Sequence, residues 1–262
     1  MKGKASDPVV GDAQVLVLAP NFPAINQPWI DTYLEQLLAN GIPFAVVSYV
    51  SRPTAYHAKV DKLGFRRRAI VCPPDKVGAC LLWVRSALKA PMTAIRRLRR
   101  MLKEQVNSET FAQRLYAAVR ASNALFLTDG LKQLKAVHAH SLDLGFEFLG
   151  LQTERGVRLV TTFHGLKPKG VPQTPEARRR RVFQSSERVI VNTEFARRHA
   201  TELGCELGRL VVLPQGLPLE DFPFAAERTP TQRGGVQLLS VGRFHRDKGQ
   251  HYSLLALRRL VN

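Results

Sequence analysis

The stretches AQVLVL at residues 13–18, WIDTYLEQLLAN at 29–40 and FAVVSY at 44–49 decide the fold. The first and third are short, continuous apolar runs, which are typical of strands buried on both faces of a sheet. The stretch between them spaces its apolar residues three or four apart and stops before Gly41, as an amphipathic helix does. A strand, a helix and a strand in this order predict a βαβ unit, and therefore a parallel sheet covered by helices.

The same alternation returns in the second half of the chain. We expect strands at 136–140, 158–163, 188–191 and 210–213, and helices at 142–153, 176–185 and 195–203. Residues 1–216 are therefore predicted to form one α/β domain, a Rossmann-like doubly wound parallel sheet. Residues 217–235 are rich in proline and glycine and predict a linker. Residues 236–262 offer one strand and one helix, at 236–241 and 250–261, so we expect a truncated second Rossmann-like domain.

The composition restricts the compartment and the partners. The chain has 39 Lys and Arg against 21 Asp and Glu, a net charge of +18, so its partners are expected to be anionic. Its three cysteines, Cys72, Cys80 and Cys205, show no CxxC spacing, which suits a reducing compartment and argues against a cysteine-based zinc site. The polar start lacks the apolar core of a secretory signal, and no apolar run is long enough to span a bilayer. These features favour a cytoplasmic protein.

Several motifs of known chemistry are absent from the sequence. There is no GxGxxG, no Walker loop, no GxSxG and no HExxH. Their absence argues against a dinucleotide oxidoreductase, a P-loop enzyme, an α/β-hydrolase and a zincin.

Six other stretches follow one another in a distinctive order. They are VLVLAPNFPAINQPWIDTYLEQLLANG at 15–41, VHAH at 137–140, TTFHG at 161–165, ERVIVNTEF at 187–195, LGCELGRLVVLPQGLPLEDF at 203–222 and SVGRFHRDKG at 240–249. Read together, they resemble the GT-B glycosyltransferases of family 4, particularly those that assemble bacterial cell-surface polysaccharides. The resemblance implies a retaining enzyme that transfers a sugar from a nucleotide diphosphate sugar to a glycan or a lipid-linked acceptor. It implies no cofactor and no metal, and the DxD metal clamp of another glycosyltransferase class is absent.

The resemblance also implies a donor site between residues 242 and 249. Gly242 and Gly249 border a loop that opens a helix, where backbone N–H groups and the helix dipole favour a phosphate. Arg243 and Lys248 match the family's cations that neutralise the donor diphosphate. The alternative is that both are solvated surface cations without a ligand. His164 matches a histidine that contacts the transferred sugar and is the catalytic candidate. Its alternative is a structural histidine bound to a loop carbonyl.

The acceptor side of the cleft is expected at the ends of the strands. The candidates are Asn21, Phe22, Gln27, His140, Asn192, Gln215 and Gly216. Relatives carry a glutamate-containing run where this chain has residues 26–29, so the first loop departs from the family pattern. Phe22 and Trp29 either stack on a sugar or belong to the core. His140 ends its strand and is expected in the cleft, whereas His138 is expected to pack in the interior.

Residues 61–105 interrupt the alternation as a basic insert. Residues 62–103 contain twelve Lys or Arg and one acid, Asp75. Apolar residues recur at helical spacing at positions 84, 88, 92, 95, 98 and 102, and Pro91 is expected to kink or divide the helix. The cations around this stripe are Arg96, Arg97, Arg99, Arg100 and Lys103. A solvated face and a nucleic-acid surface are alternatives, but stripe and charge together favour binding to an anionic membrane, with Leu98 and Leu102 at the headgroup boundary.

The sequence therefore predicts the N-terminal, acceptor-binding domain of a glycosyltransferase at the inner face of the cytoplasmic membrane. As a truncated chain it is expected to be inactive alone. The alternative is a non-catalytic protein that binds an acceptor or a membrane and needs a donor domain in trans.

Overall fold

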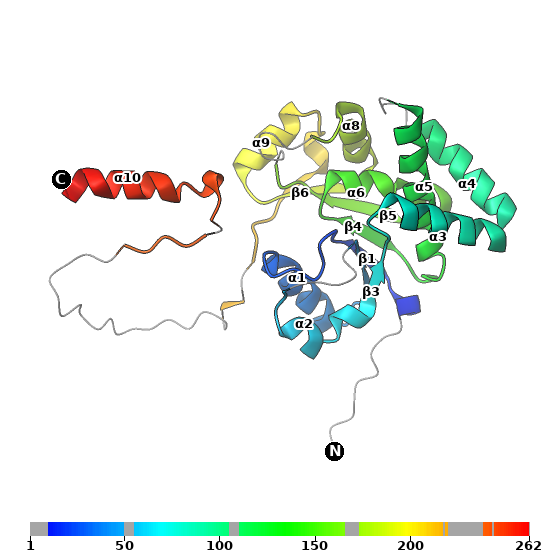
Figure 1. Ribbon diagram of the computed structural model, residues 1–262, viewed down its shortest axis with the longest axis horizontal. Helices are drawn as coiled ribbons and strands as arrows, with labels where there is room; N and C mark the ends of the chain where they lie inside the picture. Colours follow the sequence, from blue (N-terminus) through cyan, green and yellow to red (C-terminus); the bar gives the residue numbers. More distant parts are fainter. Residues whose placement is uncertain are drawn as a thin grey trace, which may run out of the picture. The chain divides into compact units, whose positions relative to one another are not determined.

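The computed structural model describes residues 10–49, 55–104, 110–165, 173–216, 218–219, 238–242 and 244–261. The chain divides into two units, Met1–Pro218 and Leu219–Asn262 (Figure 1). No helix in the described ranges has the length and apolar content required to cross a bilayer.

The first unit is built on a seven-stranded parallel sheet. Its strands are β1 (Val15–Leu18), β2 (Phe44–Ser48), β3 (Ala69–Val71), β4 (Ala136–Ala139), β5 (Arg158–Thr162), β6 (Arg188–Val191) and β7 (Leu210–Val212). They lie in the order β3-β2-β1-β4-β5-β6-β7, and every neighbouring pair is parallel. The chain adds β2 and β3 on one side of β1, then returns to add β4 to β7 on the other. This topology confirms the predicted Rossmann-like doubly wound sheet, with its switch point between β1 and β4.

Successive side chains of each strand point to opposite faces of the sheet. Leu16, Val137 and Leu159 point to a face where they join a large buried core, whereas Val17 and Val46 point to the opposite face and a second core. The first core lies under α5 (Phe111–Thr128), α6 (Leu142–Glu147), α7 (Leu149–Arg155), α8 (Glu176–Ser185) and α9 (Glu194–Glu202), and the second under α1 (Pro28–Ala39) and α2 (Lys59–Lys62) (Figure 1). Short 3-10 turns are η1 (Val10–Asp12), η2 (Phe65–Arg68) and η3 (Leu207–Arg209).

The basic insert differs from its predicted form in containing a strand. It contains β3, which pairs with β2, where only helix was expected. Its helical part is divided at Pro91, as predicted, into α3 (Lys76–Lys89) and α4 (Pro91–Glu104). Both helices pack against α5, to which the sequence analysis assigned no element. Helix α5 begins with a capping box, in which the Thr110 hydroxyl accepts from the Gln113 backbone N–H and the Gln113 side chain accepts from the Thr110 N–H.

The orientation of α4 corrects the predicted membrane stripe. Leu98 and Leu102 pack around Met101 against α5, so their prediction as lipid-facing residues is wrong. The prediction of Arg97 as a membrane-surface residue is also wrong, because its side chain is only 8% exposed. Its guanidinium donates two hydrogen bonds to Asp129 at 2.8 Å and one to Glu154 at 3.0 Å. Helix α4 therefore has an inner side, where carboxylates hold Arg97, and an outer side that carries other cations.

The second unit contains a turn and one helix in its described residues. The turn η5 (Arg246–Lys248) leads into α10 (Gln250–Val261), which confirms the helix expected at 250–261. Of the strand expected at 236–241, residues 236 and 237 lie outside the described ranges. Residues 238–241 form no strand. The apolar side chains of Leu254, Leu255 and Leu260 on α10 are exposed.

Candidate active site

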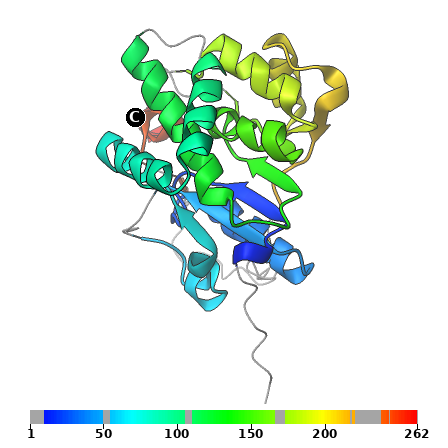
Figure 2. The same cartoon turned by 90° about the vertical axis from the view of Figure 1, so that its right-hand side faces the viewer.

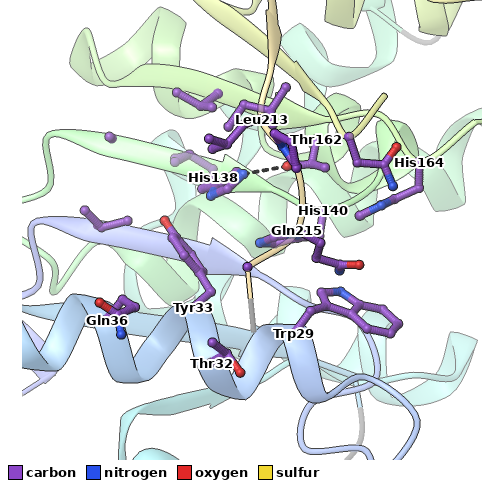
Figure 3. Close-up of a pocket in the computed structure, with 18 residues that line it drawn as sticks. Trp29, Thr32, Tyr33, Gln36, His138, His140, Thr162, His164, Leu213 and Gln215 are labelled. Atoms are coloured by element: carbon purple, nitrogen blue, oxygen red, sulfur yellow. Dashed lines mark hydrogen bonds between the residues drawn. The ribbon is translucent and has the colours of Figure 1, made fainter. Parts of the chain in front are cut away.

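A cavity of about 430 Å³ lies between α1 and the β4–β6 part of the sheet (Figure 3). Helix α1 contributes one face, formed by Trp29, Thr32, Tyr33 and Gln36, which follow one another at helical spacing. The sheet contributes alternate residues that point toward α1, so the same period of two that builds the core on one face builds a cavity wall on the other. These wall residues are Ala136, His138, His140, Val160, Thr162, His164, Ile190 and Asn192. We call this site the α1 cavity.

Three histidines form the polar part of the α1 cavity. The His138 and His140 ring centroids are 4.3 Å apart, and the His140 and His164 rings stack at 6.1 Å with an interplanar angle of 18°. Nε2 of His138 forms a hydrogen bond of 2.8 Å with the Thr162 hydroxyl. Both ring nitrogens of His140 are buried and have no hydrogen-bond partner among the described residues. The two nitrogens of His140 therefore have unused hydrogen-bonding capacity beside the cavity.

Burial keeps these histidines neutral. It lowers the pKa of His138 to about 4, with a further contribution from the charge of His164. It lowers the pKa of His140 to about 2, with contributions from His138 and His164, and it also lowers the pKa of His164. A neutral imidazole has one donor and one acceptor nitrogen, so each ring can exchange hydrogen bonds with a sugar hydroxyl near neutral pH.

Aromatic rings surround the histidine row. Tyr33 meets His138 and His140 edge-on, with ring centroids 5.0 and 5.6 Å apart. Burial raises the pKa of Tyr33 to about 12, so its hydroxyl is neutral as well. Trp29 lies 6.4 Å from His164 at the end of the α1 cavity opposite Gln36 (Figure 3). Among the described residues, no Lys, Arg, Asp or Glu lines this cavity.

A second hollow of about 310 Å³ shares a wall with the α1 cavity. His140, Thr162 and His164 line both spaces, so the histidine row separates them. The second hollow is more polar, because Ser141, Asp143, Thr174 and Arg179 also line it. The Thr174 hydroxyl donates to Asp143 at 2.9 Å, and the Ser141 hydroxyl accepts from the Leu144 N–H to cap α6. No group of three or more His, Cys, Asp or Glu in the described ranges is arranged to hold a metal ion.

The structure brings several predicted cleft residues together and leaves others apart. The residues that line the α1 cavity are His140, His164, Asn192, Gln215 and Gly216. Phe22 does not, and its prediction as a cleft residue is wrong, because it is buried in the core shared with α1. Asn21 is exposed outside the cavity, and Gln27 is the N-terminal cap residue of α1.

Thr162, Tyr33 and His138 line the α1 cavity, although none of them was predicted as a cleft residue. His138 is buried, as expected, but it also borders the α1 cavity. The signal was present in the sequence, because positions 136, 138 and 140 share one face of a strand and positions 160, 162 and 164 share one face of the next. The sequence did not show that a cavity separates this face of the sheet from α1.

The predicted donor residues lie in the second unit, and Arg243 lies outside the described residues. Gly249 has a φ of +70°, a conformation that favours glycine, and its carbonyl accepts from the backbone N–H groups of Tyr252 and Ser253 at the start of α10. A Cβ at Gly242 would lie 3.7 Å from Cγ of Lys248, so the two residues are adjacent. Lys248 is exposed. The structure thus places a cation and a glycine turn directly before a helix start.

A family model matches most of the chain. The model of glycosyltransferase family 4 matches residues 29–221, which include all of α1 after Pro28 and all strands after β1. The chain belongs to glycosyltransferase family 4. No curated protein matches this family 4 chain significantly by sequence.

One solved structure that matches part of the chain is that of HepE from Anabaena, in complex with UDP and glucose. It shares 10% sequence identity with this chain, at a TM-score of 0.45. The match covers 81% of this chain and 47% of HepE, so this chain spans about half the length of that protein.

Proposed function

We propose that the first unit is the acceptor-binding domain of a retaining, metal-independent glycosyltransferase. The observation that carries the proposal is the uncharged α1 cavity, with its neutral histidine row, in a chain of glycosyltransferase family 4. The cavity begins at the switch point of a doubly wound sheet, where ligands of such folds bind. Its described lining residues offer hydrogen bonds and ring faces but no formal charge, which suits the hydroxyl-rich, neutral surface of a sugar.

The cavity residues have distinct roles in this proposal. The rings of Trp29 and Tyr33 pack on the apolar C–H face of the acceptor sugar. His164, at the end of β5, exchanges a hydrogen bond with a hydroxyl close to the reacting atoms, and its lowered pKa keeps it neutral while it does so. His140 has two unpartnered nitrogens and borders both hollows, so it holds a second hydroxyl. Asn192, Gln215 and Gly216 complete the wall.

The donor is a nucleotide diphosphate sugar, held by residues 242–249 together with the rest of a donor domain. Arg243 and Lys248 neutralise the diphosphate, while Gly242 and Gly249 allow the backbone to approach it. The acceptor hydroxyl oxygen forms a bond to the anomeric carbon, the bond from that carbon to the phosphate oxygen breaks, and the hydroxyl proton passes to the leaving phosphate. Attack occurs on the face from which the phosphate leaves, so the configuration is retained.

The acceptor is a glycan or a lipid-linked glycan of a cell-surface polysaccharide, assembled at the inner face of the cytoplasmic membrane. Support comes from the family and from the positive charge of the chain, since a lipid-linked acceptor carries anionic phosphate at a bilayer surface.

The test is tryptophan fluorescence of the chain during titration with methyl glycosides. The two tryptophans are Trp29 and Trp83, so Trp83→Phe leaves the cavity residue as the only reporter. We expect at least one neutral glycoside to change Trp29 emission with saturation, independently of salt, and His164→Ala to weaken it. A response to nucleoside diphosphates alone, abolished by salt, would overturn the assignment of the α1 cavity to the acceptor.

A transfer assay tests the reaction itself. The chain completed with a donor domain is expected to transfer sugar with retention and in the presence of EDTA, and the chain alone is expected to be inactive, because donor and acceptor are then not held together. Inversion at the anomeric carbon, or loss of activity with EDTA that Mg²⁺ restores, would contradict the proposed mechanism.

A further inference from the structure

A stripe of exposed apolar side chains runs along α3 and continues on α4. Val77, Leu81, Val84 and Leu88 follow at spacings of three and four residues, so they share one side of α3. All are exposed, Leu81 to 65% and Leu88 to 81%. The stripe continues with Met92, which is 78% exposed, and Ile95. These six residues and the cations beside them form a surface that we call the α3–α4 face.

The cations of this face lie on the outer sides of both helices. They are Lys76, Arg85 and Lys89 on α3 and Arg96, Arg99 and Lys103 on α4, and all are exposed. Residues 76–103 contain no Asp or Glu. Arg96, Arg99 and Lys103 share a shallow hollow with Met92 and Ile95, so charge and apolar surface adjoin directly.

The rest of the fold turns this face outward. On the opposite side of α4, Met101 packs against Ala118 and Ala121 of α5. The inward-pointing Arg97 of α4 is paired with Asp129 and Glu154. Asn123 of α5 donates to the Ala79 carbonyl at 2.8 Å and fixes the inner side of α3. In Figure 2 both helices face the viewer on the outside of the unit. An apolar stripe of this length on a folded unit marks an interaction surface.

We propose that the α3–α4 face docks on an anionic phospholipid bilayer, with α3 and α4 lying in the plane of the membrane. Val77, Leu81, Val84 and Leu88 enter the boundary between headgroups and acyl chains, while the flanking lysines and arginines reach the phosphates with their charged ends. Docking on a bilayer does not depend on sugar transfer, so it can be tested without an active enzyme.

Charge decides between a bilayer and two other occupants. In a symmetric dimer the same surface would meet itself, which would place these cations against one another without an acid to neutralise them. An RNA would pair with the cations but would leave the apolar stripe in water. An anionic bilayer matches both the cations and the apolar stripe, because it offers negative phosphates above an apolar interior.

Partition of the 262-residue chain into vesicles tests the proposal. The probes are vesicles of phosphatidylglycerol with phosphatidylcholine, and vesicles of phosphatidylcholine alone. We expect binding to the first only. Arg96→Gln, Arg99→Gln and Lys103→Gln together should lower the partition coefficient about a hundredfold, because each cation near such a surface contributes roughly 1 kcal/mol, about fivefold. Leu81→Ser with Leu88→Ser should lower it at least about tenfold, since each buried methylene contributes about 0.8 kcal/mol.

Matched controls remove the same residue types from another part of the unit. Lys132→Gln with Lys135→Gln removes two exposed cations, and Leu207→Ser removes an exposed leucine on η3. Both controls should bind like the wild type. Equal losses in the controls and the face variants would show nonspecific charge attraction and overturn the proposal. So would a dimer in solution that Leu81→Ser with Leu88→Ser dissociates, or binding to RNA without binding to vesicles.

A probe at Cys80 locates the docking face directly. Cys80 is exposed beside the stripe on α3, whereas Cys72 and Cys205 are buried, so a polarity-sensitive fluorophore attaches to Cys80 selectively. Its emission should shift to the blue when phosphatidylglycerol vesicles are added. Vesicle binding without this shift would show that another surface docks.

Discussion

The α1 cavity and the α3–α4 face both leave apolar side chains accessible, yet they differ in charge and in shape. In the described part of the chain the cavity is enclosed between a helix and a sheet and has no charged residue in its lining, and burial keeps its histidines neutral. The face is the outer side of two helices and carries six cations without an acid. Accessible apolar surface alone therefore assigns no partner. The polar groups around it distinguish a neutral, hydroxyl-bearing ligand from an anionic lipid surface.

The largest effect is expected where α4 separates its inner from its outer cations. Arg97→Ala removes the guanidinium that pairs with Asp129 and Glu154 and leaves Glu154 partly buried without this partner. We expect the free energy of unfolding to fall by about 3 kcal/mol, the scale for breaking a buried ion pair. Arg96→Ala, one residue away and exposed, should change it by no more than about 0.5 kcal/mol. Urea denaturation of the two variants measures the difference, and equal stability would show that Arg97 does not anchor α4.

Substitution of a cation in the predicted donor site should impair sugar transfer without changing membrane docking. In a chain completed with a donor domain, Lys248→Ala or Arg243→Ala should lower kcat/KM about a hundredfold or more, because each removes a charge aimed at the leaving diphosphate. Partition of the same variants into phosphatidylglycerol vesicles should stay unchanged. Variants with normal rates and normal affinity for nucleoside diphosphates would contradict the donor-site assignment.

The neutral histidines predict a pH dependence of stability that the α3–α4 face does not share. The pKa of His138 is about 4 in the folded chain, below its ordinary value of 6.5, so the unfolded chain binds more protons between these values. Stability from this group is therefore complete above pH 6.5 and is lost as the pH falls toward 4. The loss is about 2 kcal/mol near pH 5.

Urea denaturation at a pH above 6.5 and at pH 5 measures this loss. His138→Asn should be less sensitive to acid than the wild type, whereas His251→Gln, an exposed substitution on α10, should behave like the wild type. An unchanged acid sensitivity in His138→Asn would show that this ring is not held neutral by the fold.

Local sequence patterns predicted much of the fold, because they depend on neighbours along the chain. The apolar runs at 13–18 and 44–49 became β1 and β2, and the helical period at 29–40 became α1. β3 was missed because its three residues lie between the arginines of η2 and two prolines, too short a run to show a period. Likewise, the spacing of the apolar residues around Leu98 did not show which side of α4 would pack on α5.

The site was less predictable, since it depends on contacts between distant segments. The ends of parallel strands meet at one edge of the sheet, which placed His140 and His164 there. Asn192 was expected at the cleft only from the family resemblance. The role of His138 required knowing that the α1 side of β4 meets a cavity. The pairing of Arg97 required Asp129 and Glu154, which lie 32 and 57 residues away along the chain.

The most direct test of the account compares the two surfaces in one assay. The rate of transfer to a soluble acceptor, without lipid, is measured in a chain completed with a donor domain. His164→Ala should lower kcat/KM by about tenfold, the loss expected for one hydrogen bond near the reacting atoms. Leu81→Ser with Leu88→Ser should leave it unchanged and abolish only vesicle binding. Normal transfer by His164→Ala together with impaired transfer by the face variant would contradict the division of roles between the α1 cavity and the α3–α4 face.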